Sequence, residues 1–189
     1  DFGTESVRGA VFDGHGNRVC TEAEAYPTAF PRPGWAEQRP ESWWRALLSV
    51  ADRLTADNRV RSEEIRSIAV DTTSCTVLLL DKDLEPLRDA ILWMDVRAFR
   101  QAERIAGCGA EILRYNGHGS VSAEWMPSKA LWIKENEPGL YERARCVCEF
   151  QDWINYRLTG ELTASINNTT VRWYYDPRAG GWPADLYAE

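Results

Sequence analysis

The amino-acid sequence predicts an α/β domain in which helices flank a mixed sheet. Two observations support this class: a strand–turn–strand pattern opens the chain, and helix patterns then alternate with short apolar runs typical of strands. A chain of 189 residues is long enough to bury one sizeable core. We therefore expect one α/β domain, or one larger domain cut short.

The first two predicted strands form a hairpin that is followed by a loop. Strand patterns cover residues 6–13 and 18–26, and the sequence DGHGN between them supplies turn residues that tolerate positive φ. Residues 27–40 contain four of the nine prolines, so we expect an extended loop there.

An amphipathic helix is predicted next, over residues 41–54. Pro40 marks its start, and its apolar positions follow helical spacing at Trp43, Leu47, Val50, Ala51 and Leu54. Strands are then expected at residues 66–71 and 75–81, joined by a short polar corner, and at residues 90–95.

The second half of the chain is predicted to be mainly helical. Helix patterns cover residues 97–107, 124–137, 138–144 and 150–160, and Gly160 suits the C-terminal cap of the last. A short strand is expected at residues 146–150, and residues 164–189 are expected to mix short helix with loop.

The charge balance argues against some classes of partner. The net charge of −7 and the lack of a Lys/Arg run disfavour nucleic acid or an anionic membrane surface as the main partner. The longest apolar runs are too short to cross a bilayer. We expect no signal peptide, and therefore a cytoplasmic protein whose five cysteines are reduced.

The residues DFGTES at positions 1–6 are candidates for a phosphate site. A glycine lets backbone N–H groups approach a phosphate, the hydroxyls of Thr4 and Ser6 can donate hydrogen bonds, and the Asp1 carboxylate can hold Mg²⁺. An ordinary turn is the alternative for so short a stretch. The sequence contains no P-loop, no G-x-S-x-G and no HExxH motif.

Five segments, in the same order along the chain, resemble the FGGY family of carbohydrate kinases. They are DFGTESVRGAVFDGHGNRV, PGWAEQRPESWW, IAVDTTSCTVLLLDKDLEPLRDAILWMDVRA, MPSKALWIKENEP and QDWINYRLTGE. DFGTES and VDTTSCT are similar to the ribulokinase-like members, and WMDVRA and RLTGE to the xylulokinases as much. The resemblance implies a pentulose-like substrate without naming the sugar.

The resemblance also implies a ribonuclease H-like fold, as in the actin-like and hexokinase-like ATPases. Residues 1–189 would form most of the N-terminal, sugar-binding domain, and the C-terminal nucleotide domain and the general-base Asp would lie beyond Glu189. We therefore expect this chain to be inactive by itself. Members of the family are often dimeric, so a homodimer is one expected assembly.

For the first turn, the resemblance implies contacts with MgATP. Asp1 would lie near Mg²⁺ and the γ-phosphate, and Thr4 and Ser6 would hold phosphates. Glu5 departs from the hydroxyl residue of many relatives. Because a carboxylate repels a triphosphate, we expect the Glu5 side chain to point away.

For the sugar, the resemblance implies contacts from three segments: Thr73, Ser74 and Cys75 in the polar corner, Trp93 and Asp95 in a W-x-D motif, and Lys129 in a helix. The small corner residues would leave room for a different sugar from those of xylulokinases or glycerol kinases.

Each of these sugar contacts has a structural alternative. The corner can be a turn closed by local hydrogen bonds, and Trp93 can be a core residue. Asp95 can pair with Arg97, and Lys129 can be a solvated helix lysine. Asp152 also matches the family, but we expect it to stabilise the start of its helix.

The implied reaction is the phosphorylation of a sugar hydroxyl by ATP with Mg²⁺, so the expected partners are a small sugar and ATP. Two alternatives stay open. One is a non-catalytic actin-like module. The other is a carbohydrate-binding module whose tryptophans form a stacking platform.

Overall fold

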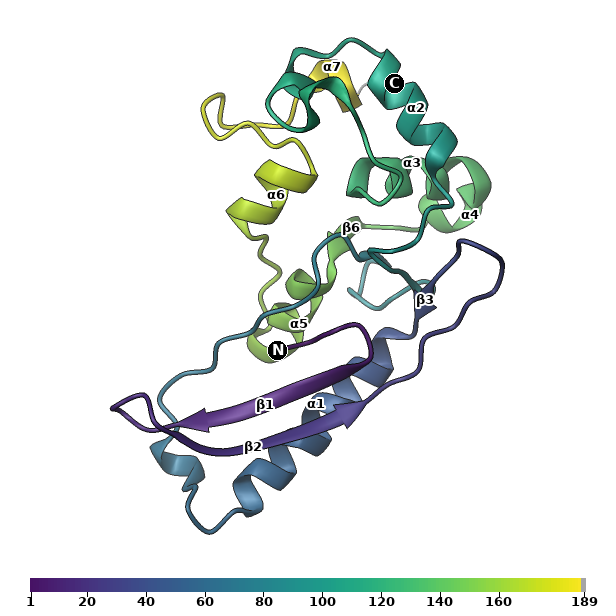
Figure 1. The fold of residues 1–189 in the computed structure, drawn as a ribbon. Coiled ribbons are helices and arrows are strands. Elements are labelled where there is room, and N and C mark those ends of the chain that lie inside the picture. The colour runs from purple at the N-terminus through teal and green to yellow at the C-terminus, as the bar shows by residue number, and fades with distance from the viewer. Residues whose placement is uncertain (188–189) are drawn as a thin grey trace.

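The structure, a computed structural model that describes residues 1–187, contains two antiparallel sheets (Figure 1). The first sheet is the hairpin of β1 (Ser6–Phe12) and β2 (Arg18–Ala25). The second has four strands, in the order β3 (Glu37–Gln38), β5 (Ala90–Ile91), β4 (Val77–Leu80) and β6 (Cys146–Glu149).

Helices cover both ends of the molecule. Figure 1 shows α1 beside the hairpin at one end, and α2, α3, α4 and α7 together at the other. The helices are α1 (Pro40–Ala56), α2 (Phe99–Gly107), α3 (Met126–Asn136), α4 (Pro138–Tyr141), α5 (Phe150–Thr159), α6 (Ile166–Arg172) and α7 (Ala184–Tyr187). Short 3₁₀ turns lie at Ser62–Glu64, Glu111–Arg114 and Gly117–Gly119.

The predicted α/β class, with sheet flanked by helices, is confirmed. Within the described residues every named strand pair is antiparallel, and the parallel part of the predicted mixed sheet is a single bridge between Phe2 and Thr72. The predicted strand at residues 66–71 is wrong. In the part of the chain that the structure describes, residues 66–71 form no strand, Ile68 is 72% exposed, and the bridge to Phe2 forms only at Thr72.

The hairpin packs closely on α1. Trp43 and Val50 of this helix are buried, as the helical spacing predicts, whereas Ala51 is exposed and Ala46 takes the inward position. Gly9 in β1 permits the close approach, because a Cβ atom there would lie 2.6 Å from Val50 Cγ1.

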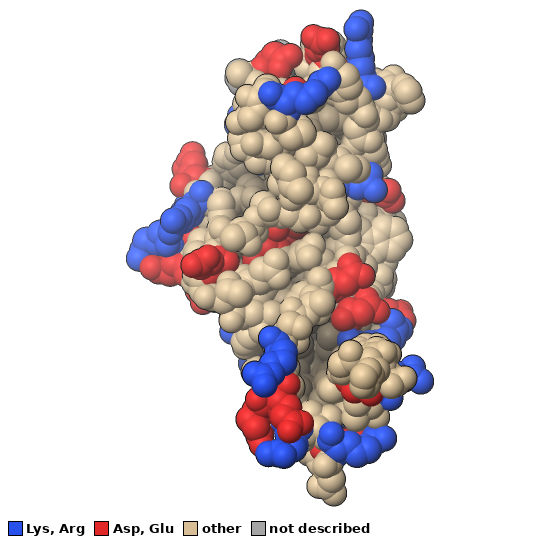
Figure 2. Space-filling view, turned by 90° about the vertical axis from the view of Figure 1, so that its left-hand side faces the viewer, with Lys and Arg blue, Asp and Glu red and all other residues tan. Residues whose placement is uncertain are grey.

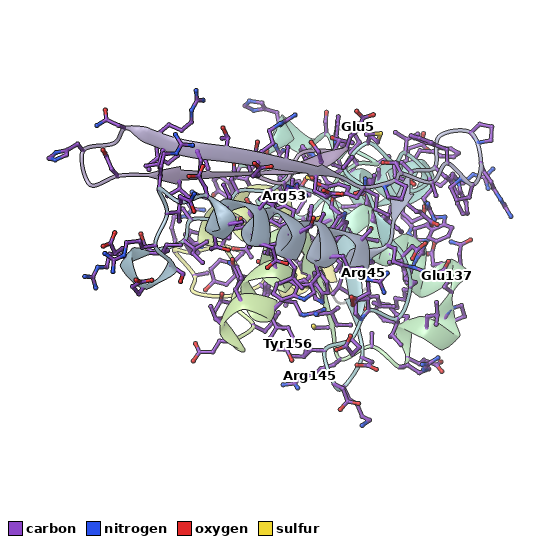
Figure 3. The ribbon with its side chains drawn as sticks, turned by 90° about the horizontal axis from the view of Figure 1, so that it is seen from below. Glu5, Arg45, Arg53, Glu137, Arg145 and Tyr156 are labelled. Carbon is purple, nitrogen blue, oxygen red and sulfur yellow. The ribbon has the colours of Figure 1, made fainter. Side chains whose placement is uncertain are left out.

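At the outer edge of this contact, α1 is tied to β2 by an arginine. Arg53 projects from α1 toward the hairpin (Figure 3) and bonds the carboxylates of Glu22 at 2.9 Å and Glu24 at 2.8 Å. These groups are all more than one-third exposed, so the pairs add little stability and chiefly fix the helix direction.

A buried ion network joins β3 to the turn after β5. The Asp95 carboxylate accepts hydrogen bonds from Arg97 and, at 2.6 Å, from the backbone N–H of Ala36. The Arg97 guanidinium lies 2.8 Å from Glu37 and stacks 3.7 Å from the ring centre of Trp35. Because Asp95 and Arg97 are both buried away from water, each charge is compensated by the other.

We expect Arg97→Met to lower the free energy of unfolding by about 3–5 kcal/mol, because it leaves the buried Asp95 charge without its cation. Urea unfolding of the protein measures this. The matched control is Arg100→Met, at an exposed position of the next helix, which should change stability by less than about 0.5 kcal/mol. A loss below about 1 kcal/mol for Arg97→Met would show that the network is not needed for stability.

Candidate functional site

The first turn of the chain lies against the polar corner that follows residue 71. The Phe2 backbone N–H donates to Asp71 O at 2.8 Å, and the Thr73 N–H donates to Phe2 O at 3.1 Å. The Phe2 side chain is buried against Phe150, with ring centres 5.2 Å apart. This anchor places residues 1–6 beside residues 73–75, as a shared site requires.

A hydrogen bond from Trp93 brings the third predicted segment to the same place. Its indole N–H donates to Thr4 Oγ1 at 3.1 Å, while the ring stays 37% exposed. Gln38 holds the turn from behind: its buried amide donates to Thr4 O at 2.6 Å and accepts from Trp43 Nε1 at 2.8 Å. The backbone of Thr4 is therefore held by buried Gln38, while its hydroxyl contacts the partly exposed indole of Trp93.

The polar corner carries a strained backbone. Cys75 has φ of +67°, in the left-handed region that residues with a side chain seldom adopt. Conformations of this kind cost of order 1–3 kcal/mol and cluster at functional sites. Thr73 and Ser74 are half-buried, and the Cys75 side chain is buried, with its Sγ 3.7 Å from Ser74 Oγ.

Lys129 links the two corners from inside the protein. Its ammonium donates to Cys75 O at 2.8 Å, Leu92 O at 2.6 Å and Trp93 O at 3.3 Å. An ammonium has three donors, so all are used, and the side chain is fully buried. Burial lowers the pKa of Lys129 to about 8. Neither the predicted direct sugar contact nor the solvated helix lysine fits this geometry, and we assign Lys129 a positioning role.

Asp95, like Lys129, is buried behind the candidate site. The structure buries its carboxylate completely, and Arg97 and the Ala36 N–H occupy both oxygens. A sugar hydroxyl could reach it only by breaking those bonds. The structural alternative, pairing with Arg97, is therefore confirmed by the geometry. Asp95 fixes the turn that carries Trp93, which lies two residues before it in the sequence.

The carboxylates that could meet a hard cation lie at the exposed start of the chain. Asp1 is exposed, and its carboxylate forms an ion pair with Arg8 at 3.5 Å. Asp71 is exposed on the adjacent segment, and its carbonyl accepts the N–H of Phe2, the residue after Asp1, at 2.8 Å. Oxygen ligands at such a position fit Mg²⁺, which typically takes one or two carboxylates together with phosphates.

Ser6 and Glu5 complete the first turn. Ser6 begins β1, and its carbonyl accepts the Gly3 N–H at 2.9 Å, which closes the turn. The Glu5 side chain is exposed and lies at the outer edge of the hairpin (Figure 3).

Sequence reasoning missed Glu149, at the end of β6. The side chain is 1% exposed, accepts a hydrogen bond from Asn168 Nδ2 at 2.9 Å, and forms a capping box with Asp152 at the start of α5. Burial, and then the nearby Asp152 charge, raises the pKa of Glu149 to about 7. The E-x-x-D spacing was the available signal. Asp152 itself has the helix-stabilising role expected for it, since it accepts the Glu149 N–H at 3.0 Å.

The face of the molecule in Figure 2 carries charges of both signs. On the face in Figure 2, Lys and Arg side chains are scattered among Asp and Glu and form no continuous basic patch. Within the described residues, no helix is long and apolar enough to cross a membrane.

Comparison with known proteins gives a family match over almost the whole chain. The profile of the FGGY family of carbohydrate kinases, N-terminal domain, matches residues 1–188. The xylulose kinase of Lactococcus lactis is 28% identical over 187 residues, which are 98% of this chain and 37% of that protein. The glycerol kinase of Thermococcus kodakarensis is 30% identical over 190 residues, 98% of this chain and 38% of that protein.

Solved structures of carbohydrate kinases superpose on this chain. A xylulose-type kinase from Brucella ovis superposes with a TM-score of 0.89 at 28% identity, covering 99% of this chain and 38% of that one. Plasmodium falciparum glycerol kinase with ADP superposes with a TM-score of 0.83 at 20% identity, which shows the shared fold. It covers 98% of this chain and 38% of that one. The present chain thus spans little more than a third of the length of these proteins.

We expect Lys129→Met to destabilise the protein by about 3 kcal/mol, because it leaves three main-chain carbonyls in a dry interior without their donor. Urea unfolding measures the loss. Lys134→Met, at an exposed position of α3, is the matched control and should cost less than about 0.5 kcal/mol. Equal stabilities for the two variants would mean that the ammonium does not hold the corners together.

Proposed function

The chain belongs to the FGGY family of carbohydrate kinases, and from this we propose that the protein transfers the γ-phosphoryl group of ATP to a hydroxyl of a small sugar or polyol. The observation that carries the proposal is the hydrogen bond from Trp93 to Thr4, since it joins the segment proposed for the sugar to the turn proposed for phosphate. A kinase needs these two functions within bonding distance of each other.

Thr4 and Ser6 are proposed to hold phosphate oxygens. The turn between Gly3 and Ser6 is closed by its own hydrogen bond, and Tyr26 Oη donates to Gly3 O at 2.5 Å. The turn therefore has little freedom to lose when a ligand binds, and rigid donors of this kind stabilise transferred charge best.

Asp1 is proposed as the protein's ligand for Mg²⁺, with Asp71 beside it. When bound, the ion would neutralise charge on the phosphates. In the part of the chain that the structure describes, no cluster of three or more metal-binding side chains forms, so other oxygen ligands would have to come from phosphates and water.

Thr73, Ser74, Cys75 and Trp93 are proposed to contact the sugar. The hydroxyls offer both donors and acceptors, and the exposed indole offers a face for C–H groups. Relatives are named for xylulose, glycerol and gluconate, which are all small polyols. Together with the small side chains of the corner, this favours a pentulose or a related polyol.

The general base and the adenine contacts are proposed to come from residues outside this chain. Among the described residues of the site, Asp1 and Asp71 are the exposed carboxylates beside the Thr73–Cys75 corner. Both are proposed for the metal, so neither is left to act as the general base. We therefore propose that residues 1–189 alone bind ligands weakly and do not turn over.

The test is a screen of the full-length protein for ADP release with pentuloses, hexuloses, glycerol and gluconate. Sugar-dependent ADP release supports the kinase. Sugar binding that is the same with and without MgATP would instead favour a carbohydrate-binding module, and nucleotide binding without any sugar dependence would favour a non-catalytic actin-like module.

We expect Asp1→Asn in the full-length protein to reduce kcat by about 100-fold, because the transition-state charge loses a metal ligand. Asp52→Asn, at an exposed position of α1, is the control and should leave kcat unchanged. An Asp1→Asn enzyme with normal kcat and normal Mg²⁺ dependence would remove Asp1 from the site.

We expect Trp93→Phe to raise KM for the sugar by about 3- to 10-fold, since phenylalanine keeps a ring but lacks the N–H that fixes it on Thr4. Exposed Trp182 provides the control Trp182→Phe, which should leave KM within error. Steady-state kinetics at saturating ATP measure KM for the sugar. A wild-type KM for Trp93→Phe as well as for Trp182→Phe would contradict the role of Trp93.

A further inference from the structure

The short strand β3 lies between the two halves of the candidate site. Its residues Glu37 and Gln38 pair with β5, and successive side chains of a strand point to opposite faces. Glu37 faces Arg97, which lies 2.8 Å away in the turn that carries Trp93. Gln38 faces the first turn of the chain, where its amide donates to Thr4 O at 2.6 Å. One strand therefore contacts both the segment proposed for the sugar and the turn proposed for phosphate.

The orientation of the Gln38 amide is fixed by Trp43. An indole N–H can only donate, so the amide turns its oxygen to Trp43 Nε1, at 2.8 Å, and its two N–H groups the other way. These donate to Thr4 O at 2.6 Å and to Thr28 Oγ1 at 2.7 Å. Gln38 is 2% exposed, and Trp43 is fully buried and stacked on Phe150 with ring centres 3.7 Å apart. The amide therefore has one orientation, in which its oxygen and both N–H groups are bonded.

The neighbouring carbonyls of the first turn are held from the core as well. Tyr26 is buried; its Oη donates to Gly3 O at 2.5 Å, and its backbone N–H donates to Glu5 O at 3.0 Å. With Gln38 on Thr4 O, three successive carbonyls are bonded to two buried residues. Loss of the Gln38 donor would release the turn at the middle one of the three.

The Thr4 hydroxyl is the group that this arrangement positions. It accepts the Trp93 indole N–H at 3.1 Å, and a hydroxyl that accepts a hydrogen bond still has its own hydrogen to donate. A phosphate oxygen beside the turn could accept that hydrogen while the Trp93 bond is kept. Because the carbonyl and the hydroxyl belong to one residue, a shift at Thr4 O moves the hydroxyl relative to both partners.

We propose that Gln38 is a positioning residue for phosphoryl transfer: its amide, oriented by Trp43, holds Thr4 so that the hydroxyl meets the transferred phosphate and the Trp93 indole together. The proposal rests on the proposed kinase function for its kinetic test. Gln38 touches neither the phosphate nor the sugar in this scheme, and it acts only through Thr4.

The kinetic test compares Gln38→Met with the wild type in the full-length protein. Methionine has a similar length but no donor for Thr4 O, so kcat should fall by about 10-fold and KM for the sugar should rise by no more than about 3-fold. The matched control is Gln101→Met. Gln101 is also a buried amide, and it bonds Glu135 between α2 and α3. Its replacement should cost stability but leave kcat unchanged.

The background Thr4→Ala separates positioning from a general loss of structure. Alanine keeps the backbone carbonyl that Gln38 binds but lacks the hydroxyl that Gln38 positions. In this background Gln38→Met should lower kcat by less than about 2-fold, because the two changes act on one interaction. A wild-type kcat for Gln38→Met, or an equal fold-decrease in both backgrounds, would overturn the proposal.

Trp43→Phe tests the same arrangement with Gln38 in place. Phenylalanine keeps a ring against Phe150 and removes the N–H that orients the amide. The amide can then also turn its oxygen toward Thr4 O, so kcat should fall by about 3-fold, and it should not fall further in the Thr4→Ala background. This variant decides the question if Gln38→Met does not fold, and an unchanged kcat for Trp43→Phe would then overturn the proposal.

A further measurement does not depend on catalysis. In the full-length protein labelled with ¹⁵N-tryptophan, the Trp93 indole signal, assigned by Trp93→Phe, reports the bond to Thr4. Gln38→Met should move this signal, and Gln101→Met should leave it in place. An unchanged Trp93 signal in Gln38→Met would overturn the proposal even for an active kinase. A signal that moves in a protein without sugar kinase activity would overturn only the proposed function.

Discussion

The buried ammonium of Lys129 is the interaction on which the site depends. It lies where the turn after β5 and the corner before β4 come together, and it satisfies one carbonyl of the corner and two of the turn. Neither segment has a regular partner for these groups, so without the lysine each would have to turn its carbonyls to solvent. The relative position of Trp93 and Cys75 follows from one side chain of α3.

Other buried charges act in the same way, as connectors between irregular segments. Asp95 and Arg97 fix the turn that carries Trp93, and Glu37 and Trp35 bring the loop before α1 into that network. Glu149 accepts a hydrogen bond from Asn168 Nδ2 and forms the capping box with Asp152, so it joins α6 to the start of α5. A buried ion pair seldom adds stability over an apolar pair, but it fixes direction. These buried charged groups lie at the ends of strands and helices, next to the candidate site.

The sequence predicted regular elements better than it predicted the roles of single residues. Helical spacing located α1, because one face of that helix packs on the hairpin, and Gly160 ended α5 in the left-handed conformation expected of a cap. The pattern at residues 66–71 resembles a strand, but strand formation needs a neighbour, and no local pattern can supply that information.

For the site, the resemblance to FGGY kinases implies roles for Thr4, Trp93 and the 73–75 corner, which the structure does bring together. The same resemblance implies sugar contacts for Asp95 and Lys129, but both side chains are buried and bonded within the protein. Glu149 was overlooked because a carboxylate beside a helix start has an ordinary explanation in capping. Its hydrogen bond from Asn168 links two elements, and local spacing does not predict that contact.

We propose that the first turn and the polar corner bind the two reactants of a phosphoryl transfer on one surface. The most direct measurement is a crystal structure of the full-length protein with a non-hydrolysable MgATP analogue and the sugar selected by the screen. The account predicts terminal phosphate oxygens within hydrogen-bond distance of Thr4 and sugar hydroxyls within hydrogen-bond distance of residues 73–75. Electron density for the sugar away from that corner, or for the terminal phosphate away from the first turn, would contradict it.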